Sequence, residues 1–80
     1  MITGNEAALK VRDYFESVHG VNAVIGFMVL DMKKNMDENQ WEVTCAFYPG
    51  VGARKRIGYF VKVDFEDGSI KEQKVAIPND

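Results

Sequence analysis

The sequence predicts an α+β domain in which one N-terminal helix packs on a four-stranded antiparallel sheet. Apolar residues recur every three or four positions over residues 3–19 and alternate with polar ones from residue 23 onward. The connections between the alternating segments are too short for the crossovers that parallel strands require, so an antiparallel meander is predicted. The 80 residues suit a single domain over 1–80.

The helix is predicted over residues 3–19. Thr3 and Glu6 have the spacing of a capping box, in which each side chain bonds the free backbone N–H of the other residue. Gly20 is the predicted stop, because glycine readily adopts the left-handed conformation that ends helices. The apolar stripe consists of Ala7, Ala8, Val11, Tyr14, Phe15 and Val18.

The four strands are predicted at residues 23–33, 40–48, 56–66 and 69–77. Asp67-Gly68 joins the last two and is typical of a two-residue type I′ turn. Alternation gives the second and third strands one strongly apolar row each, which we assign to the helix side of the sheet. These rows are Trp41, Val43, Cys45 and Phe47, and Tyr59, Val61, Val63 and Phe65.

The sheet face turned away from the helix decides the functional interpretation. With a two-residue turn, Phe60 lies opposite Val75 and Gly58 lies opposite Ile77. An apolar patch of Tyr48, Phe60, Val75 and Ile77 is then expected at one end of this face. The same register puts Glu72 and Lys74 on the helix side, which requires either that the strand extends beyond the helix or that a bulge shifts the register.

The first strand is apolar on both sides, and one helix covers only one of them. Its two rows are Ala23, Ile25, Phe27 and Val29, and Val24, Met28, Leu30 and Met32. A second copy of the chain, placed on the far face or on an edge strand, is the simplest cover for the other row. We therefore predict a small non-catalytic protein-interaction module that forms a homodimer through Tyr48, Phe60, Val75 and Ile77.

The segment 49–56 reads PGVGARKR and raises a second interpretation. A phosphate-binding P-loop ends in Lys-Ser or Lys-Thr before a helix, whereas a strand is predicted here, so the segment is interpreted as a hairpin loop. The alternative is a weak anion or nucleic-acid contact through Arg54, Lys55 and Arg56, with Tyr48, Tyr59 and Phe60 near enough to stack on bases. The net charge of −2 argues against a general polyanion binder.

No catalytic or metal-binding set can be assembled from this composition, so neither an enzyme nor a cofactor is expected. Cys45 is interpreted as a core residue and His19 as a helix-terminal one. A single cysteine forms no intrachain disulfide, which favours a cytoplasmic location. The apolar run 21–30, interrupted by Asn22 and Gly26, is too short for a membrane span.

A helix ending in glycine, followed by W-x-V-x-C-x-F and then Y-F-V-K-V-D-F-E-D-G-S-I, resembles the helix-plus-meander pattern of cystatin-like folds. Within that group the chain is similar to PepSY domains and to the gas-vesicle accessory protein O family. The resemblance covers about residues 5–77 and implies a cystatin-like roll. The Q-x-V-x-G loop of cystatin inhibitors is absent around residues 40–43, so protease inhibition is not implied.

Overall fold

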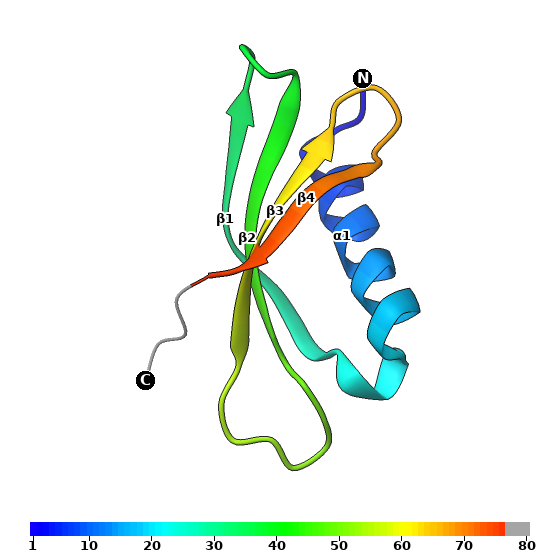
Figure 1. Cartoon of the computed structure of the whole chain (residues 1–80), viewed down its shortest axis with the longest axis vertical. Helices are drawn as coiled ribbons and strands as arrows, with labels where there is room; N and C mark the ends of the chain where they lie inside the picture. The colour runs from blue at the N-terminus through cyan, green and yellow to red at the C-terminus, as the bar shows by residue number, and fades with distance from the viewer. Residues whose placement is uncertain (77–80) are drawn as a thin grey trace.

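The computed structural model describes residues 1–76 and consists of one helix on one face of a four-stranded sheet (Figure 1). Its elements, in chain order, are α1 (Gly4–His19), the 3-10 turn η1 (Val21–Ala23), β1 (Ile25–Asn35), β2 (Gln40–Tyr48), β3 (Ile57–Asp64) and β4 (Ile70–Val75). Sequential strands pair antiparallel in the order β1-β2-β3-β4. The predicted fold class and meander order are confirmed.

Helix α1 begins and ends at the predicted signals. The Thr3 backbone N–H donates to Glu6 Oε1 at 2.8 Å, and the Glu6 N–H donates to Thr3 Oγ1 at 3.1 Å, which completes the capping box. Gly20 has φ 91°, and its N–H donates to the Glu16 carbonyl at 2.8 Å. This positive φ is open to glycine at little cost, so the chain leaves the helix there.

The core lies between α1 and the sheet face that it covers. Ala7, Val11 and Phe15 are the buried helix residues. The Phe15 ring centroid lies 5.1 Å from that of Phe47 and 4.6 Å from that of Tyr59. The buried sheet residues of this core are Val43, Cys45, Phe47, Val61 and Val63. The Trp41 and Tyr59 rows therefore face the helix as assigned, and burying each aliphatic or aromatic side chain contributes about 1.5–3 kcal/mol.

Strand β1 does not keep the simple alternation expected of it. Its register with β2 shifts between Ile25 and Met28 and again between Val29 and Asp31. Met28 pairs with Ala46 on the uncovered face, whereas Met32 pairs with Val43 on the helix face. The expectation that Met28, Leu30 and Met32 share one face is therefore wrong. The inserted residue at the second shift places the polar Asp31 on the uncovered side.

The connection between β3 and β4 is longer than expected. Residues 65–69 separate the strands, and the Asp64 N–H donates to the Ser69 carbonyl at 2.9 Å. The two-residue turn at Asp67-Gly68 is therefore wrong. Asp64 and Asp67 carboxylates accept from the Glu66 and Ser69 backbone N–H groups, respectively, and these local bonds stabilise the wider loop.

The longer loop and a bulge between Lys62 and Val63 shift the register of β4 by one residue. Phe60 pairs with Lys74, and Val75 pairs with Tyr59, so Val75 lies on the helix face and not beside Phe60. The bulge alternative is confirmed, because it moves Glu72 and Lys74 off the helix side. Ile77, the fourth residue of the predicted patch, lies outside the described residues.

Candidate interaction surfaces

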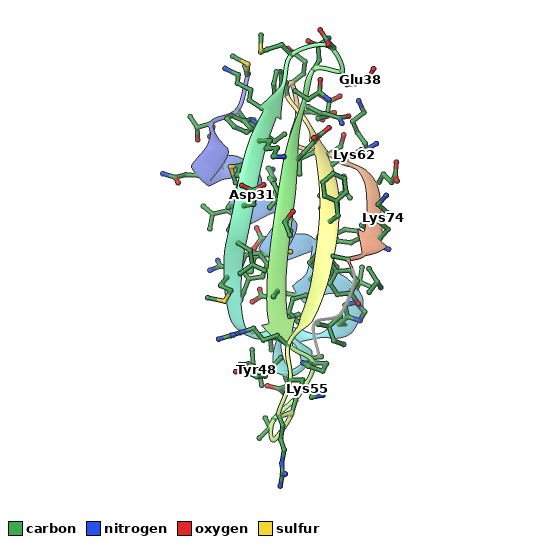
Figure 2. The ribbon with its side chains drawn as sticks, turned by 90° about the vertical axis from the view of Figure 1, so that its left-hand side faces the viewer. Asp31, Glu38, Tyr48, Lys55, Lys62 and Lys74 are labelled. Atoms are coloured by element: carbon green, nitrogen blue, oxygen red, sulfur yellow. The ribbon has the colours of Figure 1, made fainter. Side chains whose placement is uncertain are left out.

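Within residues 1–76, no helix lies over the sheet face opposite α1, and this face is divided into two halves (Figure 2). Around Tyr48 the face is mostly apolar, whereas Lys62 stands on its other half. Asp31 and Lys74 stand at the boundary, in the cross-strand row that also contains Phe60. The apolar half consists of Ile25, Met28, Ala46, Tyr48, Gly58 and Phe60. The expected division into a polar end and an apolar end is thus present. Val75 is not part of the apolar end, and Ile25 and Met28 of β1 extend it at the opposite edge of the sheet.

Side chains of the apolar half are only partly protected from solvent. Met28 keeps 38% of its surface exposed, and Leu30, in the neighbouring bulge, keeps 56%. Tyr48 and Phe60 are half-buried. Ala46 is nearly covered by its neighbours. The face therefore presents apolar side chains that keep part of their surface exposed to solvent.

Each aromatic ring on this face lies beneath a cation. The Arg56 guanidinium carbon is 4.8 Å from the Tyr48 ring centroid, and Lys74 Nζ is 5.5 Å from that of Phe60. Such contacts contribute about 0.5–1 kcal/mol at exposed sites.

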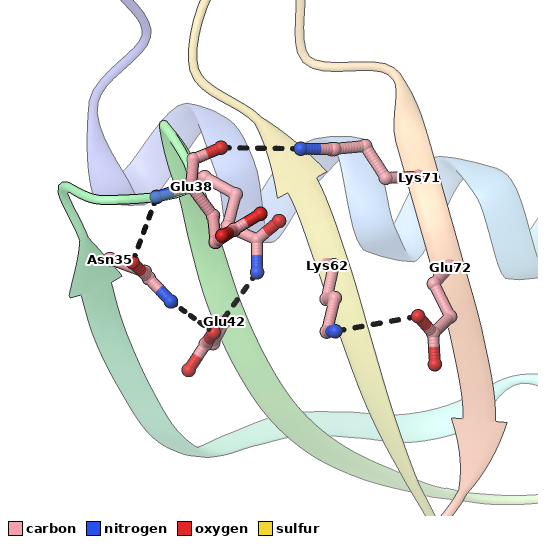
Figure 3. Close-up of polar contacts among 7 residues, drawn as sticks. Asn35, Glu38, Glu42, Lys62, Lys71 and Glu72 are labelled. Atoms are coloured by element: carbon pink, nitrogen blue, oxygen red, sulfur yellow. Dashed lines mark hydrogen bonds and ion pairs between the residues drawn. The ribbon is translucent and has the colours of Figure 1, made fainter.

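The polar half is held by a network at the end of the β1–β2 hairpin (Figure 3). Asn35 Nδ2 and Gln40 Nε2 donate to Glu42 Oε2 at 2.8 and 3.0 Å. These bonds, from Asn35 first and Gln40 second, hold the pKa of the Glu42 carboxyl below its usual range. Lys62 Nζ lies 3.4 Å from Glu72 Oε1, a partly exposed pair of small energetic value.

Among the three cations of the loop 49–56, one contacts an aromatic ring of the uncovered face. Arg56 contacts the Tyr48 ring, and Lys55 lies at the loop end of the uncovered face (Figure 2). Tyr59 was expected to be available for stacking on bases. It pairs with Cys45 on the helix face and packs on Phe15, so that expectation is wrong. Tyr48 is the aromatic residue of the uncovered face that lies nearest this loop in sequence.

Cys45 and His19 occupy the environments expected for structural residues. Cys45 is completely buried, and burial raises the pKa of its thiol to about 12, so the nucleophilic thiolate is strongly disfavoured. His19 is exposed in the last turn of α1, with its ring centroid 6.0 Å from that of Phe15. Residues 1–76 contain no group of three or more His, Cys, Asp or Glu side chains that could hold a metal ion.

A shallow groove of about 330 Å³ lies between the C-terminal half of α1 and the β3–β4 edge. Its walls include Tyr14, Val18 and His19 from the helix and Tyr59, Gln73 and Val75 from the strands. Val18 and Val75 are 58% and 57% exposed. Sequence reasoning missed this groove because it rested on the wrong register of β4, which placed Val75 on the other face.

No protein-family model, no curated protein and no solved structure matches this chain. The resemblance to cystatin-like folds, PepSY domains and the gas-vesicle accessory protein therefore stays a prediction. Among the described residues, no helix is long and apolar enough to cross a membrane.

Proposed function

We propose that this chain is a small non-catalytic protein-interaction module that forms a homodimer through the uncovered face of its sheet. The observation that carries the proposal is the apolar half of that face, where Met28 is 38% exposed and Tyr48 and Phe60 are half-buried with no helix above them. Contiguous apolar surface of this kind is typical of association sites. A second copy supplies a matching surface, because a two-fold interface joins the same patch on both subunits.

The size and charge of the face are compatible with a dimer. The two longer extents of the molecule, 39 and 24 Å, bound the whole face at about 900 Å², so an interface of roughly 800 Å² per partner would include the polar half as well as the apolar half. The polar half carries both signs of charge, with Asp31 and Glu72 near Lys33 and Lys62. Neighbouring charges of both signs allow complementary contacts at the rim of the interface.

Sedimentation velocity at micromolar concentration tests the proposal. The expected mass is twice the 9.0 kDa of the chain. Met28→Glu should shift the protein to a monomer, because it places a carboxylate among the apolar side chains of the face. Val51→Glu is the matched control, since Val51 is 87% exposed in the loop after β2 and should leave the dimer intact. A monomeric wild-type chain, or a Met28→Glu dimer of unchanged strength, would contradict the proposal.

A weak nucleic-acid contact is the second candidate, supported by the Tyr48 ring beside Arg56 and the neighbouring cations Arg54 and Lys55. Labelled single-stranded RNA and DNA should then bind more tightly at low salt, and replacement of the three cations by serine should abolish binding. Binding that survives this triple replacement, or no binding at low salt, would reject this candidate.

A further inference from the structure

Strand β4 forms one edge of the sheet, and part of its backbone points away from β3. The Ala76 N–H donates to the Gly58 carbonyl at 2.8 Å, which makes these two residues a hydrogen-bonded pair of the ladder. Hydrogen-bonded and non-hydrogen-bonded pairs alternate in an antiparallel ladder, so Lys74 also bonds β3, whereas Gln73 and Val75 do not. The N–H and C=O groups of Gln73 and Val75 are therefore directed to the open edge.

The same two residues line the groove beside α1. Gln73 and Val75 project their side chains to the helix face, where Tyr14 and Val18 form the opposite wall. A chain segment that paired with β4 would thus place every second side chain in the groove. The other sheet edge is less suitable, because β1 carries two register shifts that interrupt regular pairing.

Charged side chains of β4 restrict which added strand can pair with its open edge. Glu72 is paired with Lys62 at 3.4 Å, and Lys71 Nζ donates to the Glu38 carbonyl at 3.2 Å (Figure 3). Within residues 1–76, Lys74 Nζ contacts the Phe60 ring and no carboxylate. An acidic side chain opposite Lys74 would complete a cross-strand pair on this side of the sheet.

We propose that β4 and the groove beside α1 bind an extended peptide of a partner protein by strand addition. The peptide carries the pattern apolar, acidic, apolar. Its two apolar side chains lie over the groove opposite Gln73 and Val75, and its acidic side chain lies opposite Lys74. The groove lies on the opposite side of the sheet from Met28, and Lys74 lies on β4, at the opposite sheet edge from Met28 on β1, so the site does not depend on the homodimer.

Fluorescence anisotropy with a labelled heptapeptide Ser-Thr-Phe-Glu-Phe-Thr-Ser tests the proposal. The sequence reads the same in both directions, so it fits parallel and antiparallel addition alike. We expect the Lys-centred peptide Ser-Thr-Phe-Lys-Phe-Thr-Ser to bind at least about tenfold more weakly, an effect of the order expected for a charged pair with a hydrogen bond. Lys74→Glu should reverse this preference, which a merely structural role of Lys74 would not do.

Gln73→Pro separates backbone pairing from side-chain contact. The Gln73 N–H faces the open edge, so proline there removes no bond to β3 and should leave the circular dichroism spectrum and the melting temperature nearly unchanged. Peptide binding should fall at least about tenfold, whereas Gln73→Thr, which keeps the N–H, should retain it. Met28→Glu should also retain it, which distinguishes this site from the proposed dimer surface around Met28.

Four results would overturn the proposal. Equal binding of the Glu-centred and Lys-centred peptides would remove the role of Lys74, and unchanged binding to Gln73→Pro would exclude strand addition. Dissociation of a homodimer by Gln73→Pro would show that a second copy occupies this edge in place of a partner peptide. Absence of binding to the folded wild-type chain at millimolar peptide would equally reject the site.

Discussion

Replacement of Phe15 by alanine should remove a large part of the stability of this fold. Phe15 is 1% exposed, and its ring contacts those of Phe47 and Tyr59 at centroid distances of 5.1 and 4.6 Å. Truncating a buried phenylalanine costs about 3–5 kcal/mol. A domain of 80 residues has a free energy of unfolding of about 4–12 kcal/mol. Phe15→Ala should therefore leave the chain marginally folded.

Urea denaturation, followed by far-ultraviolet circular dichroism at one fixed chain concentration, measures this loss. Val18→Ala is the matched control on the same helix, because Val18 is 58% exposed, and it should change the free energy of unfolding by less than about 0.5 kcal/mol. A loss below about 1 kcal/mol for Phe15→Ala, or equal losses for the two variants, would refute the conclusion that this aromatic cluster holds α1 on the sheet.

Three further predictions concern ionisation and backbone conformation. Burial raises the pKa of the Cys45 thiol to about 12, so as the pH rises the unfolded chain loses the thiol proton before the folded chain does. The thiol should therefore leave the free energy of unfolding unchanged below about pH 9 and lower it by up to about 1.4 kcal/mol per pH unit above that pH. Urea titrations at pH 8 and 10 should show that the free energy of unfolding falls less for Cys45→Ala than for the wild-type chain. An equal fall in the two proteins would contradict the raised pKa of the Cys45 thiol. The hydrogen bond from Asn35 lowers the pKa of the folded Glu42 carboxyl, so the stabilisation that this bond gives is present above the pKa of the unfolded chain and is lost as the pH falls through the folded pKa. Asn35→Ala should raise the pKa of Glu42 in an NMR titration, and an unchanged pKa would argue against the bond. Gly68 has φ 74°, so Gly68→Ala should lower the free energy of unfolding by about 1–2 kcal/mol and lower the melting temperature. Gly50→Ala is the control and should not lower it, because a Cβ added at Gly50 would have no atom within 4 Å. Equal melting temperatures of the two variants would contradict the positive φ of Gly68.

The helix and the central strands could be predicted because each depends on a local signal. The capping pair Thr3 and Glu6 marks the helix start, and Gly20 marks its end. Rows such as that of Val43 alternate strictly, since β2 and β3 are paired on both sides and cannot shift without burying polar groups. Local pattern and tertiary packing agree at these positions, and prediction succeeds there.

The edge strands could not be predicted as well, because a bulge there costs little and has no specific sequence signal. In β1 the shift near Leu30 turns Met32 to the core, and in β4 the shift beside Lys62 turns Glu72 and Lys74 away from it. One sign of the second bulge was present in the sequence, because the register of a two-residue turn placed the charged Glu72 and Lys74 on the helix side. The groove beside α1 depends on that shift and so became visible only in the structure.

The central claim, that a second copy covers the uncovered face, is tested most directly by nuclear Overhauser effects between copies. A sample that mixes chains labelled with ¹³C at the methionine methyl groups with unlabelled chains reports only contacts between copies. We predict signals from the Met28 methyl to aromatic protons of Tyr48 or Phe60 of the other copy. A spectrum of associated chains in which Met28 shows no contact to the other copy would contradict the claim.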